Sequence, residues 1–250
     1  MELLNKNRLI ERVDVVDSTN SYLKNIVYDK RPEEGSMVIA KFQSAGRGQM
    51  GNGWSSEVGK NLLLSLVIYP DGLLANEQFI ISRMASLAVK NCLDQFVDDI
   101  RIKWPNDIFW KDKKIAGMLI ENDVQGKYIQ NSIIGIGINI NQQGFSEDLP
   151  NPVSLRQITG TDNDIDNIAD IFVREFFLLY REFQDGMSTQ IEDEYMLDLY
   201  RVNDYYWFED KDGSFKAKIK EVMPSGHLVL ETMDEGDLRQ YAFKEVSFVD

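Results

Sequence analysis

Residues 134–141 carry the run Ile134-Gly135-Ile136-Gly137-Ile138-Asn139-Ile140-Asn141. Isoleucine occupies every second position and glycine or asparagine occupies the positions between, which is the period of a β-strand. One face of that strand is nearly bare, because its glycines have no side chains. Glycine inside a strand weakens it unless another group approaches the backbone closely. The run therefore predicts a strand whose bare face lies against a flat ligand.

Shorter β-rich runs precede this strand, and Pro105, Asp112 and Gly126 separate them, a spacing typical of a mixed sheet with hairpins. Farther upstream, two more strands flank a loop over residues 44–59 that contains five glycines. The predicted strands cover residues 36–42, 62–69, 100–103, 107–111, 115–121 and 128–140. Apolar residues at helical spacing predict one helix that begins near Asp17 or Ser18 and three more over residues 77–96, 165–183 and 190–199.

The composition changes after about residue 200. Five short β-rich runs fill the last 46 residues, at 207–208, 215–222, 227–232, 238–243 and 246–249, with turn residues between them. A tail of that size indicates a small antiparallel barrel. The sequence therefore predicts an α+β chain with a mixed-sheet domain and flanking helices over residues 1–200 and a small β-barrel over residues 201–250.

The charges are unevenly distributed along the chain. Its 250 residues include 27 Lys+Arg and 41 Asp+Glu, a formal net charge of -14. Residues 1–140 contain 17 of each sign, whereas residues 141–250 contain 10 basic and 24 acidic residues. Proteins that bind duplex DNA present a basic stripe to its phosphates, and the acidic second part offers none. Two short basic clusters, at 41–60 and 111–114, suit a small anion better than a polymer.

Several classes of protein are excluded by the same sequence. The longest apolar run, residues 62–69, is broken by Ser65 and is far shorter than the roughly 20 residues that cross a bilayer. The first twenty residues carry charges throughout and show no signal-peptide pattern, so we expect a cytoplasmic protein. One cysteine and one histidine form neither an intrachain disulfide nor the usual structural zinc site.

The glycine-rich loop contains Gly46-Arg47-Gly48-Gln49-Met50-Gly51, which matches the pattern G-x-G-x-x-G. In a dinucleotide-binding fold the third glycine opens a helix, but residues 52–56 show no apolar period. A Walker A loop fails as well, because Lys60 is followed by Asn61. The loop instead offers backbone N–H donors, an arginine that binds phosphate and a tryptophan, Trp54, that can cover a purine.

Two further motifs display polar groups beside strands. Lys103-Trp104-Pro105-Asn106-Asp107 places a cation, an aromatic ring, an amide and a carboxylate at a strand break, because Pro disfavours a helix before it and Asn-Asp favours a turn. Such a set suits a metal-nucleotide or a ureido-like ligand. Lys113-Lys114-Ile115-Ala116-Gly117 begins an apolar strand with lysine. Lys111 and Lys113 fit the solvated lysines of a hairpin turn, whereas Lys114 fits that description less well.

The motifs follow one another in a specific order. They are Ser18-Thr19-Asn20, Gln43 with Gly46-Arg47-Gly48, Trp54, Lys103-Trp104-Pro105-Asn106-Asp107, Lys114-Ile115-Ala116-Gly117 and Gly135-Ile136-Gly137-Ile138-Asn139. This order and spacing, over about residues 15–141, resemble the biotin protein ligase family. The barrel-like tail is similar to the family's small C-terminal domain. The resemblance implies a class II synthetase-like catalytic domain and an SH3-like barrel.

Members of that family activate biotin with MgATP to biotinyl-5'-adenylate and then transfer biotin to one lysine of a carrier protein. The resemblance implies an ATP-dependent ligase that uses Mg²⁺ and acts on the biotin carboxyl carrier protein of acetyl-CoA carboxylase or a related carboxylase. The implied catalytic residues are Arg47, Lys114 and Asp107, with Asp107 also the candidate metal ligand. The implied biotin-binding residues are Ser18, Thr19, Asn20, Gln43, Gly46, Arg47, Gly48, Gln49, Lys114, Gly117 and Gly135. The implied ATP-binding residues are Arg47, Trp54, Lys103, Asn106, Lys114 and Asn139.

The chain departs from the family in two respects. Many relatives carry arginines where this chain has Gln49, Met50 and Asn52, which predicts weaker retention of the adenylate. Some members also carry an N-terminal helix-turn-helix domain that binds operator DNA, and only 17 residues precede Ser18 here. We therefore expect a monofunctional ligase that binds neither DNA nor membranes and that is a monomer or a homodimer.

Two alternative functions stay open. Lipoate ligases and octanoyl transferases have a similar catalytic fold, and the transferases use a cysteine thioester, for which Cys92 is the candidate. Its place on an apolar helix face favours core packing instead. The other alternative is a non-catalytic biotin or nucleotide sensor, which would not need both Arg47 and Lys114. The polar Ser18-Thr19-Asn20 set and these two cations favour the biotin ligase.

Overall fold

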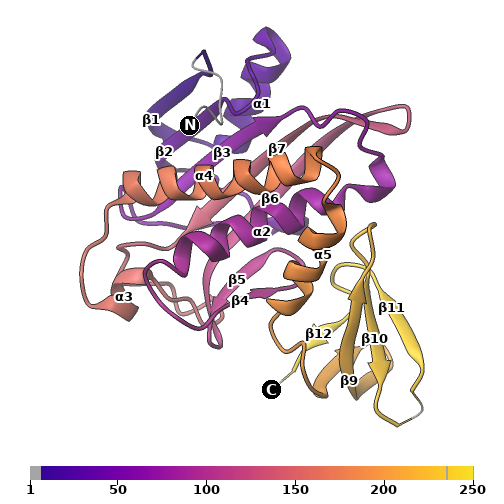
Figure 1. Ribbon diagram of the computed structural model, residues 1–250. Coiled ribbons are helices and arrows are strands. Elements are labelled where there is room, and N and C mark those ends of the chain that lie inside the picture. Colours follow the sequence, from indigo (N-terminus) through magenta and orange to yellow (C-terminus); the bar gives the residue numbers. More distant parts are fainter. Residues whose placement is uncertain (1–6, 235, 250) are drawn as a thin grey trace.

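The computed structural model describes residues 7–234 and 236–249, and Figure 1 labels most of its helices and strands. The first part of the chain forms β1 (Ile10–Val16), α1 (Thr19–Lys30), β2 (Met37–Gln43), β3 (Leu62–Ile68), α2 (Phe79–Leu93), β4 (Ile100–Lys103), β5 (Asp107–Trp110), β6 (Lys113–Gln125) and β7 (Tyr128–Ile138). Next come α3 (Leu155–Thr159), α4 (Ile165–Gln184) and α5 (Ser188–Leu197). The chain then forms β8 (Tyr206–Asp210), β9 (Gly213–Val222), β10 (Leu228–Thr232), β11 (Leu238–Tyr241) and β12 (Ser247–Phe248). Two short 3-10 turns, at Gln49–Gly51 and Ala75–Glu77, complete the set.

Seven strands form a mixed sheet in the order β1-β2-β3-β7-β6-β5-β4. Strands β1 and β2 are parallel, and the other neighbours in this sheet are antiparallel. At its centre Gly135 of β7 pairs with Ser65 of β3, and Gly137 pairs with Gly117 of β6. The predicted mixed sheet with hairpins is confirmed, and three glycines and a serine lie together in its middle.

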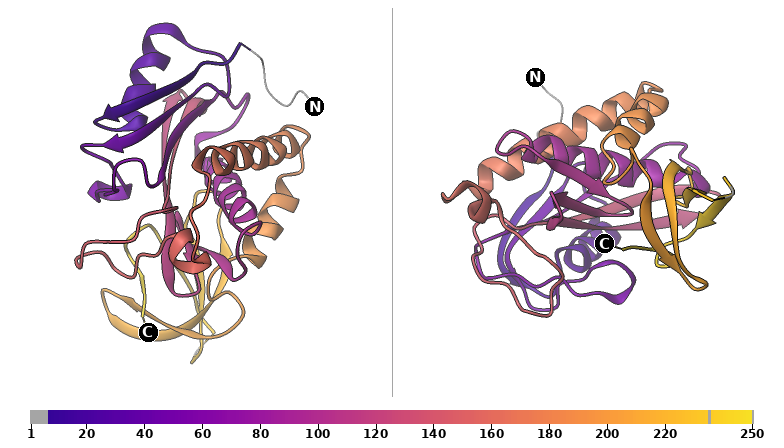
Figure 2. Two further views of the ribbon diagram at one scale, coloured as in Figure 1. Left: turned by 90° about the vertical axis from the view of Figure 1, so that its left-hand side faces the viewer. Right: turned by 90° about the horizontal axis from the view of Figure 1, so that it is seen from below.

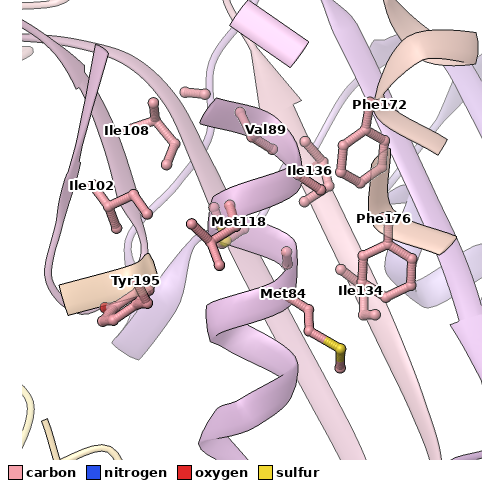
Figure 3. Close-up of a cluster of buried hydrophobic side chains, with 14 of the residues drawn as sticks. Met84, Val89, Ile102, Ile108, Met118, Ile134, Ile136, Phe172, Phe176 and Tyr195 are labelled. Atoms are coloured by element: carbon pink, nitrogen blue, oxygen red, sulfur yellow. The ribbon is translucent and has the colours of Figure 1, made fainter. Parts of the chain in front are cut away.

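The two faces of this sheet differ, because successive side chains of a strand point to opposite sides. On one face Ile134 and Ile136 of β7 pack with α2 and α4 in the main hydrophobic core (Figure 3). On the other face α1 packs in a smaller cluster of buried residues that includes Val67 and Ile133. Figure 2 shows α1 and the α2–α4 layer on opposite sides of the sheet. The glycines of β7 therefore face the side of α1.

The last strands form a separate five-stranded antiparallel sheet in the order β11-β10-β9-β8-β12. All five predicted strands of the tail are present. Figure 1 shows this sheet in yellow and gold beside α5. The mixed sheet with flanking helices and the second antiparallel sheet confirm the predicted fold class. The division of the chain at residue 200 stays a prediction, and residues 1 and 250, where the predicted domains begin and end, lie outside the described residues.

One strand and one α-helix were not predicted. Strand β1 lies at the edge of the sheet, and three of its seven residues are charged, which conceals the strand pattern. Helix α3 has only five residues, although Ser154 and Gln157 form the capping box that marks such a start. Helices were expected at the places where α1, α2, α4 and α5 are found. Within the described ranges 7–234 and 236–249, every helix is too short or too polar to cross a membrane.

Candidate active site

A cavity of about 230 Å³ opens on the α1 side of the large sheet. The glycine-rich loop, the start of α1, strands β6 and β7, and the turn after β11 surround it. Most of the residues predicted for the site line this cavity, namely Ser18, Thr19, Asn20, Gln43, Arg47, Gly48, Gln49, Trp54, Asn106, Asp107, Lys114, Gly117 and Gly135. Segments almost 120 residues apart in the sequence thus meet in one place.

Four neutral side chains form a hydrogen-bonded group, called here the polar cluster, which consists of Thr19, Asn20, Gln43 and Ser65. The Thr19 backbone N–H and hydroxyl donate to Gln43 Oε1 at 2.8 and 3.0 Å. Ser65 Oγ lies 2.7 Å from Thr19 Oγ1 and 2.5 Å from Asn20 Oδ1. Thr19, Asn20 and Gln43 line the cavity, so the cluster presents hydroxyl and amide oxygens that can accept hydrogen bonds from a ligand.

Asn20 is fixed by its surroundings. Its Nδ2 donates to the Leu119 carbonyl at 3.1 Å and to Glu121 Oε2 at 2.8 Å, which turns Oδ1 toward Ser65. A Cβ on Gly135 would lie 2.2 Å from Asn20 Oδ1. Only glycine fits there, because real Cβ atoms essentially never approach another atom that closely. Gly135 is therefore required for the close approach of the amide to strand β7.

The indole of Trp54 lies on the same bare face of the sheet. A Cβ on Gly137 would lie 2.4 Å from the ring, and a Cβ on Gly117 would lie 3.0 Å from it. Lys114 Nζ lies 5.7 Å from the ring centroid. The sequence predicted that a flat ligand covers these glycines. Part of that face is instead occupied by the chain's own indole and by the Asn20 amide, and the cavity opens beside them.

Two basic side chains, Arg47 and Lys114, face carboxylates of the protein. Arg47 makes two hydrogen bonds to Glu121, at 2.6 and 3.2 Å. Lys114 Nζ lies 2.6 Å from Asp107 Oδ1. All four side chains keep some contact with solvent, so these ion pairs can be exchanged for pairs with an anionic ligand at modest cost.

The glycine-rich loop holds Arg47 in place through its own backbone. Arg47 and Gly53 form an antiparallel bridge, the Trp54 N–H donates to the Gly46 carbonyl at 2.9 Å, and the Gly48 N–H donates to the Asn52 carbonyl at 2.6 Å. The loop is thus a small hairpin that presents the arginine and the tryptophan on one side. The side chain of Met50 lies outside the described residues.

Three of the residues predicted for the site do not line the cavity: Gly46, Lys103 and Asn139. Lys103 Nζ lies 4.5 Å from the Phe109 ring centroid and 5.2 Å from that of Phe248, on the side of the C-terminal sheet. The Asn139 amide donates to the Val153 carbonyl at 3.2 Å. In this structure Asn139 therefore holds the segment that leads into α3, and its predicted contact with ATP stays a prediction.

Comparison with known proteins agrees with this geometry. The model of the Biotin/lipoate A/B protein ligase family matches residues 13–139, which is half of the chain and includes the glycine-rich loop, the polar cluster and both basic residues. The chain belongs to the biotin/lipoate A/B protein ligase family.

Three relatives illustrate the extent of the similarity. The bifunctional ligase/repressor BirA of Bacillus subtilis is 31% identical over 236 residues, which cover 92% of this chain and 71% of that protein. The biotin-[acetyl-CoA-carboxylase] ligase of Paracoccus denitrificans is 33% identical over 147 residues, 56% of this chain and 60% of that protein. The structure of biotin protein ligase from Aquifex aeolicus in complex with biotin and ATP has the same fold, with a TM-score of 0.77 at 23% identity over 96% of this chain and 97% of that chain.

In this ligase family a thioester route needs an accessible thiolate, so the position of the single cysteine decides whether that route is available to this chain. Cys92 is fully buried in the main core, and its Sγ lies 3.5 Å from the Ile168 carbonyl. Burial raises the pKa of the thiol to about 12. The cysteine does not line the cavity. The interpretation of Cys92 as a core residue is confirmed.

Sequence reasoning missed four residues of this family member's site. Ser65 and Glu121 hold Asn20, and Phe243 and Lys244 line the cavity from the C-terminal sheet. Ser65 had a visible signal, since it is the one polar residue in an apolar strand that is fully buried. The other three lacked a signal, because nothing in the sequence places them near the cavity.

Proposed function

We propose that this chain is a biotin protein ligase that uses ATP to convert biotin to biotinyl-5'-adenylate, with release of pyrophosphate, and then transfers the biotinyl group to a lysine of a carrier protein. The observation that carries the proposal is one cavity in which a neutral polar cluster lies beside Arg47 and Lys114. Biotin has the same two parts, a ureido ring with two N–H donors and a carboxylate. The oxygen acceptors that Thr19, Asn20 and Gln43 bring to the cavity suit a ureido N–H, whereas a dithiolane or an alkyl chain has no N–H to offer.

The first half-reaction would need little proton transfer. A carboxylate is already an anion at neutral pH, so its oxygen attacks the α-phosphorus directly, and the bond to the bridging oxygen breaks as pyrophosphate leaves. The two anions must be held in line while charge moves to the leaving group, which is a task for positioned cations. Arg47 and Lys114 would exchange Glu121 and Asp107 for oxygens of the carboxylate and the phosphate.

Mg²⁺ is expected to bind mainly through the phosphates. Among residues 7–234 and 236–249, His, Cys, Asp and Glu form no group of three or more that could bind a metal. Asp107 is the one carboxylate on the cavity lining in that part of the chain. A single carboxylate with substrate phosphates is a usual Mg²⁺ environment, so Asp107 fits the group, and the ion would neutralise charge on the triphosphate.

The second half-reaction would transfer biotin to an amine. The lysine nitrogen of the acceptor attacks the acyl carbon of the adenylate, AMP leaves, and the nitrogen loses a proton. We propose that the acceptor is the biotin carboxyl carrier protein of acetyl-CoA carboxylase or a related carboxylase. The name of the Paracoccus denitrificans relative supports this acceptor. Asp107 is the candidate for orienting the incoming amine.

Pyrophosphate release tests the function directly. Purified protein with MgATP is given biotin, lipoate, octanoate or no acid, and hydroxylamine is added to turn the adenylate over. Release with biotin alone supports the proposal. Release with lipoate or octanoate assigns the chain to the other branch of its family. Lys114→Ala is expected to bind biotin to within about fivefold of the wild type but to make no adenylate, whereas a sensor would release no pyrophosphate with either protein.

A further inference from the structure

Glu121 of β6 joins two parts of the cavity, although it does not line the cavity itself. Its Oε2 accepts hydrogen bonds from Asn20 Nδ2 at 2.8 Å and from Arg47 Nη2 at 2.6 Å. Arg47 Nη1 donates to the other carboxylate oxygen at 3.2 Å. Asn20 belongs to the polar cluster and Arg47 to the glycine-rich loop, and both line the cavity. One carboxylate therefore connects the neutral part of the site to its cation.

Strand β6 fixes the position of this carboxylate. Side chains two residues apart in a strand point to the same side, so Glu121 lies on the side of Gly117, where the cavity opens. Its cross-strand neighbour on β7 is Ile133, which is buried in the cluster under α1. Arg47, by contrast, is carried by a loop. Glu121 is thus a fixed point to which the arginine of the loop is attached.

The pair between Arg47 and Glu121 uses the part of the guanidinium that a ligand would use. Two parallel N–H···O bonds are the arrangement in which arginine binds carboxylates and phosphates. An anionic ligand that takes the same two nitrogens must therefore replace Glu121. The two side chains are 43% and 24% exposed, so the exchange gives up one partly solvated ion pair and forms another, with a small net gain.

Glu121 keeps a partner after such an exchange. Its Oε2 still accepts from Asn20 Nδ2, and its partial exposure lets water solvate the rest of the carboxylate. A charge that stays hydrogen-bonded and partly solvated avoids the large cost of a buried unpaired ion. The exchange therefore leaves Asn20, and with it the polar cluster, in place.

We infer that Glu121 is a positioning residue that competes with the carboxylate of biotin for Arg47. The inference rests on the proposed ligase function, because it takes biotin as the ligand. In the empty protein Glu121 holds Arg47 at the cavity, and on binding the ligand carboxylate takes its place. Because one ion pair replaces another, the carboxylate adds little net affinity. The affinity for an acid then depends mainly on the contacts of its ring with the polar cluster.

Glu121→Gln tests this competition by calorimetric titration. Glutamine keeps the shape of the side chain and an oxygen acceptor for Asn20 Nδ2, but it removes the charge that competes for Arg47. The variant should bind biotin about fivefold more tightly than the wild type. Biotinol has the same ring but an alcohol in place of the carboxylate, so both proteins should bind it equally within about twofold. A residue with a merely structural role would change the affinity in the opposite direction.

Ionic strength gives a second measurement. In the wild type the exchange conserves the number of ion pairs, so the Kd for biotin should change little between about 0.05 and 0.5 M salt. Glu121→Gln forms a new ion pair with the ligand, so its Kd should rise about fivefold over the same range. The same salt dependence in both proteins would contradict the competition.

Asp123→Asn is the matched control. Asp123 lies two residues farther along the same face of β6, about 7 Å away, and it does not line the cavity. Its carboxylate lies 3.8 Å from Lys24 Nζ. The variant loses the same charge as Glu121→Gln, so its affinity for biotin should equal that of the wild type. Equal tightening in both variants would overturn the inference, as would equal tightening toward biotinol.

The titrations separate this inference from the proposed function, because they need no turnover. A wild type that binds biotin but releases no pyrophosphate would refute the proposed adenylation, and the two variants would still decide the role of Glu121. With pyrophosphate release intact, an unchanged biotin affinity in Glu121→Gln would refute the role of Glu121 alone. Weaker biotin binding together with a lower melting midpoint would assign Glu121 a structural role and likewise overturn the inference.

Discussion

Ser65 is a single hydroxyl that links α1 to strand β3. It is completely buried, and its Oγ contacts both Thr19 and Asn20. A buried polar group is stable only when it is hydrogen-bonded, so the serine and the two α1 residues specify one another. The polar cluster is therefore built before any ligand binds, which reduces the entropy that binding must overcome.

Ser65→Ala should weaken biotin binding specifically. The change leaves Asn20 Oδ1 without its donor inside the protein, which is expected to cost about 1–2 kcal/mol of unfolding free energy. The KM for biotin should rise about tenfold, with the KM for ATP unchanged. Ser86→Ala is the control, because Ser86 is equally buried but contacts Met118 Sδ and does not line the cavity. The same rise in both variants would refute the role of Ser65.

Cys92 should be dispensable for activity. Cys92→Ala is expected to release pyrophosphate at the rate of the wild type, and iodoacetamide at pH 8 should leave the native thiol unmodified, because its pKa is raised from 9.0 to about 12. Loss of biotin-dependent activity with an intact fold would instead indicate a thioester route.

The same thiol makes stability depend on pH. The folded state retains the thiol proton above the pKa of the unfolded state, so the contribution of Cys92 is complete below pH 9 and is lost as the pH rises toward about 12. Urea denaturation at several pH values should show the wild type losing stability relative to Cys92→Ala over that interval. A constant difference from pH 8 to pH 11 would contradict the shifted pKa.

At the scale of elements, the spacing of apolar residues and the positions of turn residues were sufficient to predict most strands and helices. The alternation in residues 134–138 correctly gave a strand with one apolar face, since Ile134, Ile136 and Ile138 lie in the core. Strand β1 was not predicted, because an edge strand needs little apolar surface. Its Ile10 and Val15 are largely exposed, so the pattern carries no core-facing stripe.

The site was less predictable than the fold, because contacts between distant segments leave no local pattern. From the order of the motifs we expected Arg47, Lys114 and the polar residues of α1 to share one site, and all of them line the cavity. The motifs gave no information on which polar side chains face the cavity. Lys103 was expected there, but its side chain lies against aromatic rings of β5 and the C-terminal sheet. Lys244 reaches the site only through the packing of two sheets.

Gly137 of β7 leaves room for the Trp54 indole against the strand. Gly137→Ala would place a methyl 2.4 Å from the Trp54 ring, which forces the indole away and should cost about 1–3 kcal/mol of unfolding free energy. Near-ultraviolet circular dichroism should change, and adenylation at low biotin should slow about tenfold.

The control for Gly137 is Gly144→Ala. A Cβ on Gly144 would meet only Glu57 Oε1, at 3.7 Å, so stability and adenylation should both stay close to the wild type. If Gly137→Ala behaved like Gly144→Ala, the indole would not depend on the bare face of β7.

At the scale of the whole molecule, a buried arginine joins the two sheets. Arg83 of α2 is 2% exposed, and its guanidinium forms an ion pair with Glu192 of α5 and donates to the Val222 carbonyl of β9. The rings of Phe79 and Tyr195 lie beside it, 5.6 and 5.9 Å from the guanidinium carbon. Three elements thus share one charged group, which orients the C-terminal sheet and hence the turn that bears Lys244.

Arg83→Met should therefore affect both stability and ATP binding. The aliphatic chain keeps most of the packing, but the Val222 carbonyl loses its donor and Glu192 its partner, so the unfolding free energy should fall by about 2–3 kcal/mol. Looser attachment of the C-terminal sheet should expose the connection at Arg201 to trypsin and raise the KM for ATP, while the KM for biotin stays unchanged. Arg174→Met, which removes an exposed arginine paired with Glu175, should alter each quantity little. An Arg83→Met protein with less stability but an unchanged KM for ATP would show that the position of the C-terminal sheet does not govern nucleotide binding.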